Sequence, residues 1–177
     1  MLRFIMRRVA AAMQRRYNYD GSYMEEVAAV SSGGAMRLLL LPLFSQYRGT
    51  APIDLAAGAA VASTREGDCG PCLQLAVDMA LEQGASVEDL RRALAGDATS
   101  AGEVGLGFRF ACAAIADSDE LAALRAEIAA RYGEAAVVSL SIAAATGRTW
   151  PVIKRGLGHG QACSLVTVGD AAVEAAV

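Results

Sequence analysis

Two cysteines three positions apart, Cys69 and Cys72, are the residues of this chain best suited to chemistry. They stand where an alanine-rich segment ends and a helical pattern over residues 71–83 begins, so both thiols are predicted at the first turn of a helix. The unpaired N–H groups and the positive end of the helix dipole stabilise an anion there, and such settings lower a thiol pKa from about 8.5 to about 7. The spacing therefore suits a reversible dithiol/disulfide pair.

The same spacing also occurs in zinc sites and in pairs of packed thiols. A tetrahedral zinc site needs two more ligands, and the chain offers Cys112, Cys163 and the single His159, which form no second ligand pair. Zinc is therefore disfavoured, and we expect neither a metal nor another cofactor. We expect Cys112 and Cys163 to be buried small hydrophobic side chains.

A reactive thiol needs a base, and two residues are candidates. Glu66 lies three positions before Cys69, and His159 lies between two glycines in a loop that could reach the cysteines. A carboxylate close to a thiolate raises the thiol pKa unless it transfers a proton. His159 has an alternative interpretation as a surface or loop-packing residue, and both interpretations stay open.

Length and composition indicate one globular domain over residues 1–177, with a helical extension at about 1–48. The formal charge of −3 gives no reason to expect nucleic acid as a partner. Hydrophobic residues make up 54% of the chain but aromatic residues only 6%, so alanine supplies much of the apolar content. Because small-faced helices also pack well between subunits, we expect a homo-oligomer.

Neither a membrane span nor a secretory signal is predicted. The most apolar run, residues 38–44, is far shorter than the ~20 residues that a span needs. The N-terminal segment is interrupted by arginines and has no continuous apolar stretch of the kind found in secretory signals. We therefore expect a cytoplasmic protein without a membrane partner, in which a structural disulfide framework is disfavoured.

Helical periodicity and helix start and stop signals predict an all-α fold. Ser22 and Glu25 have the spacing of a capping box at the start of the second helix. Residues 31–34 should end that helix before the third one begins. Residues 164–168 form the only plausible strand. The expected helices cover residues 2–13, 22–30, 35–47, 53–63, 71–83, 86–95, 103–116, 121–132, 134–145 and 150–154.

Several segments together carry a family resemblance, and they span most of the chain. They are Tyr19-Asp20 to Met24, Ala51-Pro52, Asp68 to Leu75, Trp150 to Lys154, and Gly160 to Cys163. With the cysteine pair between two helices, the sequence resembles the carboxymuconolactone decarboxylase and alkylhydroperoxidase D superfamily, in particular its bacterial members with a longer chain.

The resemblance implies an all-α oligomer whose cysteine pair reduces a peroxide. It assigns Cys72 the attack that yields a sulfenic acid and Cys69 the step that resolves it to a disulfide, which an external dithiol then reduces. The family's peroxidases also have a histidine four residues after the second cysteine and a glutamate about a dozen residues before the first. Here those positions hold Ala76 and Ala57.

Three functional hypotheses follow. The first is a thiol-dependent peroxidase or dithiol/disulfide oxidoreductase that uses Cys69 and Cys72. The second is a non-enzymatic protein in which this pair forms a redox-sensing or structural disulfide, as the two missing relay residues suggest. The third is decarboxylase-type chemistry, which a lone histidine and a Cys-x-x-Cys pair support poorly.

Overall fold

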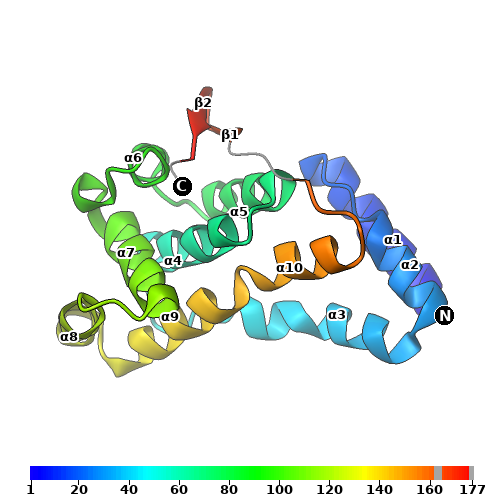
Figure 1. Cartoon of the computed structure of the whole chain (residues 1–177), viewed down its shortest axis with the longest axis horizontal. Helices are drawn as coiled ribbons and strands as arrows, with labels where there is room; N and C mark the ends of the chain where they lie inside the picture. Colours follow the sequence, from blue (N-terminus) through cyan, green and yellow to red (C-terminus); the bar gives the residue numbers. More distant parts are fainter. Residues whose placement is uncertain (162–164, 176–177) are drawn as a thin grey trace.

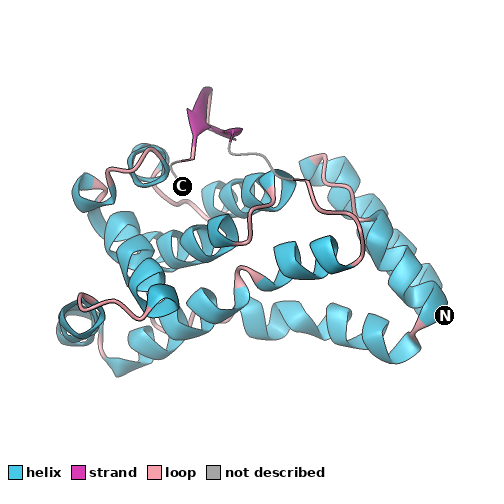
Figure 2. Ribbon diagram, in the orientation of Figure 1, coloured by secondary structure: helices cyan, strands magenta, loops and turns pink. Residues whose placement is uncertain are grey.

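Helices form most of the computed structural model, which describes residues 1–161 and 165–175 (Figure 1 and Figure 2). The cysteine motif lies between the fourth and fifth helices, at the start of the fifth. The helices are α1 (Leu2–Tyr17), α2 (Ser22–Val30), α3 (Ser32–Ser45), α4 (Ile53–Glu66), α5 (Gly70–Glu82), α6 (Val87–Leu94), α7 (Gly102–Ala116), α8 (Leu121–Tyr132), α9 (Glu134–Thr146) and α10 (Thr149–Gly156), with a 3₁₀ turn, η1 (Ala98–Ser100).

The main core lies where α4 packs against α7 and α9. Glycines allow α4 and α7 to approach closely: a Cβ on Gly58 would overlap the Val104 carbonyl oxygen, and one on Gly107 would overlap the Leu55 carbonyl oxygen. Small residues therefore hold this helix pair at backbone contact, and larger side chains such as Phe108 fill the space beside it.

The three N-terminal helices pack around a second apolar cluster, which also includes both cysteines of the motif. Helix α1 ends at Asn18, which adopts a left-handed conformation (φ 51°) and directs the chain into a short loop before α2. The buried members of the cluster are Met6, Tyr19, Tyr23, Met24, Ala28, Ala35, Leu38, Cys69 and Cys72.

Two local predictions in this region are wrong. Ser22 is the first residue of α2 rather than its cap, and the Asp20 carboxylate accepts the Ser22 N–H at 2.9 Å, so no capping box forms. The expected break at residues 31–34 is reduced to one residue, Ser31, between α2 and α3. The Ser31 hydroxyl accepts the Gly34 N–H at 3.0 Å, and this N-cap allows α3 to begin at Ser32. A good cap therefore outweighs the helix-breaking tendency of the two glycines that follow.

The chain is mostly helical, as predicted, but it also has a small antiparallel sheet of β1 (Leu165–Val168) and β2 (Ala171–Glu174). The predicted strand corresponds to β1, and its first residue, position 164, lies outside the described residues. The sequence analysis missed β2. Gly169 (φ 65°) and Asp170 form the two-residue turn, a Gly-Asp pair that is a recognised hairpin signal.

One stretch, Glu134–Gly156, has the length and composition of a membrane span, with a mean hydropathy of 1.2. The prediction of no membrane span depends on residues 38–44, the most apolar continuous run, and does not account for this longer stretch. In the structure 44% of the most apolar 18-residue part of this stretch is buried. Its first helix, α9, packs against α4 and α7. A core helix of a soluble protein satisfies the same criteria, so this stretch is weak evidence for a span.

Candidate functional site

The cysteine pair lies at the start of α5, where the spacing predicted it. Cys69 is the N-cap residue and Cys72 lies in the first turn. The two residues form a disulfide with their Cα atoms 5.3 Å apart, and their exposed fractions are 3% and 4%. The pair therefore combines a helix N-terminus, which favours a thiolate, with burial, which opposes one.

The end of α10 and the segment after it hold the turn that carries the cysteines. The Gly70 N–H at the start of α5 donates to the Gln161 carbonyl at 3.0 Å. The Arg155 guanidinium donates to the carbonyl oxygens of Gly67 and Asp68. Asp68 itself has a positive φ of 48°, a conformation that aspartate tolerates better than most residues. Contacts distant in sequence thus fix the backbone on which the disulfide forms.

A buried polar cluster lies against Cys72. The Tyr19 hydroxyl is 3.8 Å from the Cys72 sulfur and 3.4 Å from the Tyr23 hydroxyl. The Lys154 ammonium, on a residue only 2% exposed, lies 4.5 Å from the centre of the Tyr19 ring and 5.5 Å from that of Tyr23. It also donates to the Asp20 carbonyl at 3.5 Å. Tyr19 from the loop, Tyr23 from α2 and Lys154 from α10 therefore form one cluster, and it contacts the Cys72 sulfur through the Tyr19 hydroxyl.

Burial shifts the titration of this cluster in defined directions. It raises the pKa of the Tyr19 hydroxyl, which a hydrogen bond with Tyr23 partly offsets, and it raises the pKa of Tyr23. Burial also lowers the pKa of Lys154, against the opposing charge of Asp20. Both tyrosines are therefore protonated at neutral pH, when a phenol O–H serves as a hydrogen-bond donor.

An apolar cavity of about 490 Å³ lies beside Cys72. Side chains from α1, α2, α3 and α5 form most of its wall, and methionines are prominent among them. Its lining includes Met6, Val9, Met13, Tyr17, Tyr19, Tyr23, Met24, Leu38, Leu39, Pro42, Cys72, Leu75, Ala76, Met79 and Trp150. Methionine side chains adapt readily to ligands of different shape, so the cavity suits an apolar group that approaches the Cys72 sulfur.

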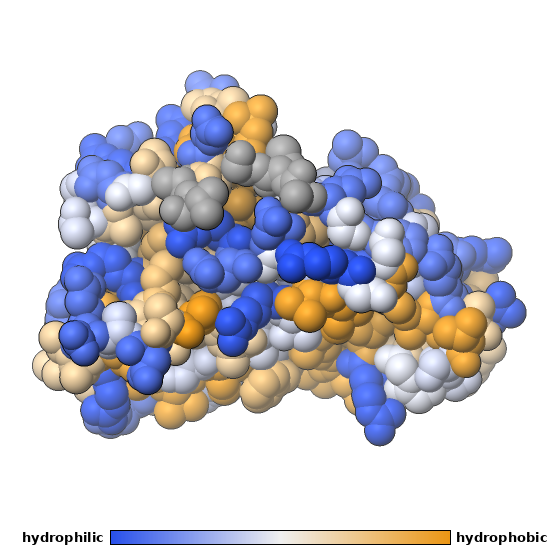
Figure 3. Space-filling model, in the orientation of Figure 1, coloured by the Kyte–Doolittle hydropathy of each residue, from blue (hydrophilic) through white to orange (hydrophobic). Residues whose placement is uncertain are grey.

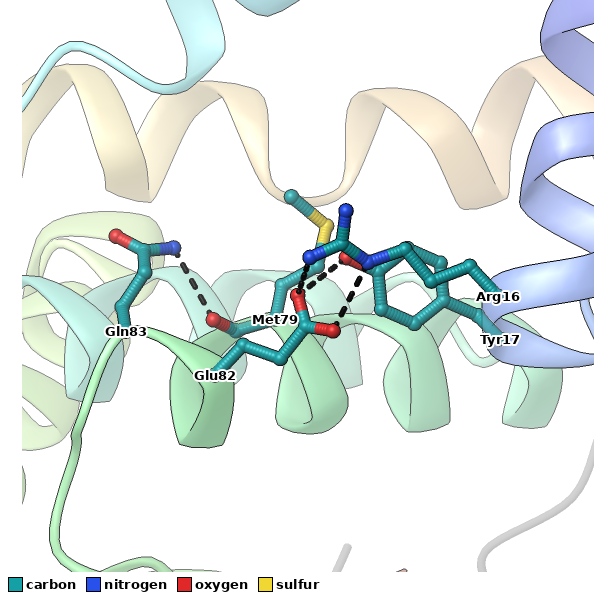
Figure 4. A network of polar contacts seen from close by, with 5 residues as sticks. All are labelled: Arg16, Tyr17, Met79, Glu82 and Gln83. Carbon is teal, nitrogen blue, oxygen red and sulfur yellow. Dashed lines mark hydrogen bonds and ion pairs between the residues drawn. The ribbon is translucent and has the colours of Figure 1, made fainter.

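A polar clasp joins α1 to α5 at the edge of this cavity (Figure 4). The Tyr17 hydroxyl donates to Glu82 at 2.6 Å, and the Arg16 guanidinium donates to both carboxylate oxygens of Glu82 at 3.0 and 2.9 Å. Arg16 and Tyr17 also line the cavity. The clasp therefore connects the helix that bears Cys72 with the helix that covers it.

The two candidate bases lie elsewhere. Glu66 is exposed at the end of α4 and pairs with Arg65 at 3.2 Å, and no polar contact joins it to either cysteine among the described residues. His159 pairs with Glu26 at 2.9 Å, while its ring centre is 6.1 Å from that of Tyr23. The structure thus brings His159 to the edge of the polar cluster but not to a cysteine.

The remaining residues singled out from the sequence are also placed. Cys112 on α7 is half-buried, and burial raises the pKa of its thiol although the Arg65 guanidinium, 3.6 Å away, opposes this. Cys163 lies outside the described residues. Ala57 is buried in α4 and Ala76 lines the cavity. Within residues 1–161 and 165–175, no cluster of three or more metal-ligating side chains is present.

Sequence reasoning missed the polar cluster of Tyr19, Tyr23 and Lys154. Tyr19 and Lys154 belong to segments that carry the family resemblance, yet nothing in their local sequence indicates that a lysine 135 positions later contacts the tyrosine. The spacing of the two tyrosines is the one available signal. Comparisons with protein-family models, with curated proteins and with solved structures give no match.

Proposed function

We propose that this chain is a thiol-dependent peroxidase of the alkylhydroperoxidase D-like type, with Cys72 as the attacking thiol and Cys69 as the resolving thiol. One observation carries the proposal: Cys72 lies in the first turn of α5, pairs with Cys69, and faces an apolar cavity of about 490 Å³. The Cys72 sulfur therefore has a helix N-terminus, a partner thiol and space for a substrate beside it.

The reaction proceeds in three balanced steps. The Cys72 thiolate attacks the terminal oxygen of a hydroperoxide, the O–O bond breaks, and the products are a sulfenic acid and an alkoxide that takes a proton from water. The Cys69 thiol then attacks the sulfenic sulfur, which forms the disulfide and releases water. An external dithiol finally reduces that disulfide to two thiols and becomes a disulfide itself.

The cavity favours an organic hydroperoxide over hydrogen peroxide. Its wall is mainly aliphatic, thioether and aromatic, so an alkyl or aryl group gains from leaving water there.

Oxidation of the reduced protein by cumene hydroperoxide tests this function. We expect loss of two thiols per chain, a Cys69–Cys72 disulfide by mass spectrometry, and turnover when a dithiol such as reduced lipoamide is supplied. Cys72→Ser should abolish the reaction, and Cys69→Ser should leave a sulfenic acid that a dimedone probe traps. Cys112→Ser is the matched control and should react normally. Peroxide consumption no faster than that of a free thiol would refute the proposal.

A second candidate function is a redox-sensing or structural disulfide. Both cysteines belong to the apolar cluster that joins the N-terminal helices to α5, so a change in their oxidation state alters a group packed at that junction. This function predicts that oxidation changes assembly or partner binding without turnover. If Cys72→Ser retains the same assembly and stability under oxidising and reducing conditions, this alternative fails.

We further propose that the protein is a cytoplasmic homo-oligomer. Large apolar side chains are exposed along α3 and at the start of α1, including Phe4, Leu40, Leu43 and Phe44. Figure 3 shows apolar surface on the right-hand side of the molecule, where these helices lie. Sedimentation equilibrium tests the assembly: a monomer at micromolar concentration would contradict it.

A further inference from the structure

The proposed peroxidase lacks an evident means of ionising Cys72. The two positions at which the resembled family has its relay residues hold alanine, and Glu66 and His159 make no contact with either sulfur among the described residues. Cys72 is 4% exposed and borders an apolar cavity, so desolvation raises the free energy of its thiolate. The helix N-terminus offsets only part of this cost.

One polar side chain does reach the sulfur. The Tyr19 hydroxyl lies 3.8 Å from it, within hydrogen-bonding range for a sulfur acceptor, and the disulfide-bonded sulfur is a weak acceptor. When the disulfide is reduced and Cys72 ionises, the same O–H faces a negatively charged sulfur. Hydrogen bonds to a charged acceptor are roughly twice as strong as those between neutral groups.

From this arrangement, which rests on the proposed function, we infer that Tyr19 is a catalytic residue whose hydroxyl donates a hydrogen bond to the Cys72 thiolate, and that Lys154 is its positioning residue. The tyrosine takes the place of the absent relay as the group that stabilises the charged sulfur.

In the part of the chain that the structure describes, the ionisable groups packed around Tyr19 are consistent with a donor hydroxyl. From α2, the Tyr23 hydroxyl lies 3.4 Å away, and from α10 the Lys154 ammonium lies over the ring at 4.5 Å. Asp20 is the adjacent residue, but its carboxylate bonds the Ser22 N–H and only its backbone carbonyl accepts from Lys154. Burial raises the pKa of the Tyr19 hydroxyl, so it keeps its proton at neutral pH.

Lys154 acts on Tyr19 rather than on the sulfur. A cation over a phenol ring withdraws electron density from it and makes its O–H a better donor. Lys154 is 2% exposed, and among residues 1–161 and 165–175 it forms no ion pair within 4 Å. A negative charge on Cys72 strengthens the hydrogen bond from Tyr19, and the Lys154 charge over the Tyr19 ring favours the same hydrogen bond.

The test is the pKa of the Cys72 thiol in the fully reduced protein. It is measured from the pH dependence of alkylation by iodoacetamide, with each cysteine quantified separately by mass spectrometry. Tyr19→Phe removes the hydroxyl and keeps the ring, so we expect the Cys72 pKa to rise by about one unit and the thiolate fraction at pH 7 to fall about tenfold. Tyr132→Phe is the matched control, because that hydroxyl bonds Glu103, and it should leave the Cys72 pKa unchanged.

Lys154 supplies a second, independent variant. Lys154→Met should raise the Cys72 pKa by less than Tyr19→Phe does. Lys154→Arg keeps the positive charge and should leave the Cys72 pKa at its wild-type value. An unchanged Cys72 pKa in folded Tyr19→Phe and Lys154→Met proteins would overturn the inference. If the Tyr19→Phe protein does not fold, an unchanged Cys72 pKa in the Lys154→Met protein would refute the proposed effect of the lysine charge on the Tyr19 ring.

The proposed peroxidase function and the proposed role of Tyr19 can be refuted independently of each other. The thiol pKa is measured without any peroxide, so a shifted pKa in Tyr19→Phe supports the role of Tyr19 even when turnover is absent. Peroxidase turnover with an unchanged pKa in Tyr19→Phe would instead support the proposed function and refute Tyr19 as its catalytic residue.

Discussion

The Tyr17 hydroxyl on α1 donates a hydrogen bond to the Glu82 carboxylate on α5 at 2.6 Å, at the edge of the cavity that Cys72 faces (Figure 4). These two residues are 65 positions apart in the sequence, and their contact holds the N-terminal helix over the helix of the reactive pair.

Glu82→Ala should loosen α1 without unfolding the protein. The Arg16 and Tyr17 hydrogen bonds to this carboxylate are lost together, so we expect hydrogen exchange in α1 to become several-fold faster while α4 and α7 keep their protection. Hydrogen–deuterium exchange by mass spectrometry measures this. Glu88→Ala removes another exposed ion pair, with Arg92, and should leave α1 unaffected. Equal exchange in both variants would mean that the clasp does not restrain α1.

Gly58→Ala should destabilise the whole fold. A Cβ at this position would overlap the Val104 carbonyl oxygen, so α4 and α7 must separate, and we expect a loss of more than about 3 kcal/mol in the free energy of unfolding. Gly156→Ala is the matched control, because this helical glycine has no heavy atom within 4 Å of the added Cβ. It should change stability by less than about 0.5 kcal/mol. Urea denaturation followed by circular dichroism compares the two.

The contribution of Asp20 should depend on pH. Its hydrogen bond from the Ser22 N–H lowers the pKa of the Asp20 carboxyl below the ordinary value of 3.8, so the folded state favours the ionised form. The stabilisation is complete above that ordinary value and is lost as the pH falls through the lowered pKa. Asp20→Ala should therefore cost about 1 kcal/mol at pH 7 and progressively less in acid. A difference from wild type that is independent of pH between 2 and 7 would contradict this cause.

Reduction of the disulfide separates a catalytic pair from a structural one. Cys69 and Cys72 enclose a short loop, so the chain-entropy model assigns the crosslink only about 2 kcal/mol. For a catalytic pair, we expect reduction to lower the free energy of unfolding by no more than this and to leave the helix content unchanged. Urea denaturation with and without a phosphine reductant measures the effect. Unfolding of α1 to α3 on reduction would favour the structural disulfide instead.

Ala76→His should increase the reactivity of Cys72. Position 76 lies one helical turn after Cys72 and borders the cavity, so an imidazole there has room beside the sulfur. A neighbouring imidazolium lowers a thiol pKa, and we expect oxidation by cumene hydroperoxide at pH 7 to become about tenfold faster. Ala76→Leu supplies similar bulk without a ring nitrogen and should give no gain. Stopped-flow oxidation compares the two, and equal rates would show that the imidazole does not reach the thiol.

The sequence by itself determined the helices and the position of the cysteine pair. Both depend on local physics: apolar periodicity, glycine stops, and the unpaired N–H groups at the first turn of α5, where Cys69 and Cys72 stand. Local rules failed where two of them compete, as at Ser31, whose cap overcame the following glycines. They also failed in β2, a four-residue strand in which Val173 is the single β-branched residue beside two alanines.

Only the tertiary structure decided what surrounds Cys72. The contacts of its sulfur with Tyr19, of Tyr19 with Lys154, and of Tyr17 with Glu82 join positions between 53 and 135 residues apart. Such contacts depend on how whole helices pack, because no local pattern specifies which buried hydroxyl faces which sulfur. Sequence position and chemistry make Glu66 and His159 candidate bases, but Glu66 pairs with its sequence neighbour Arg65, and helix packing places His159 against Glu26.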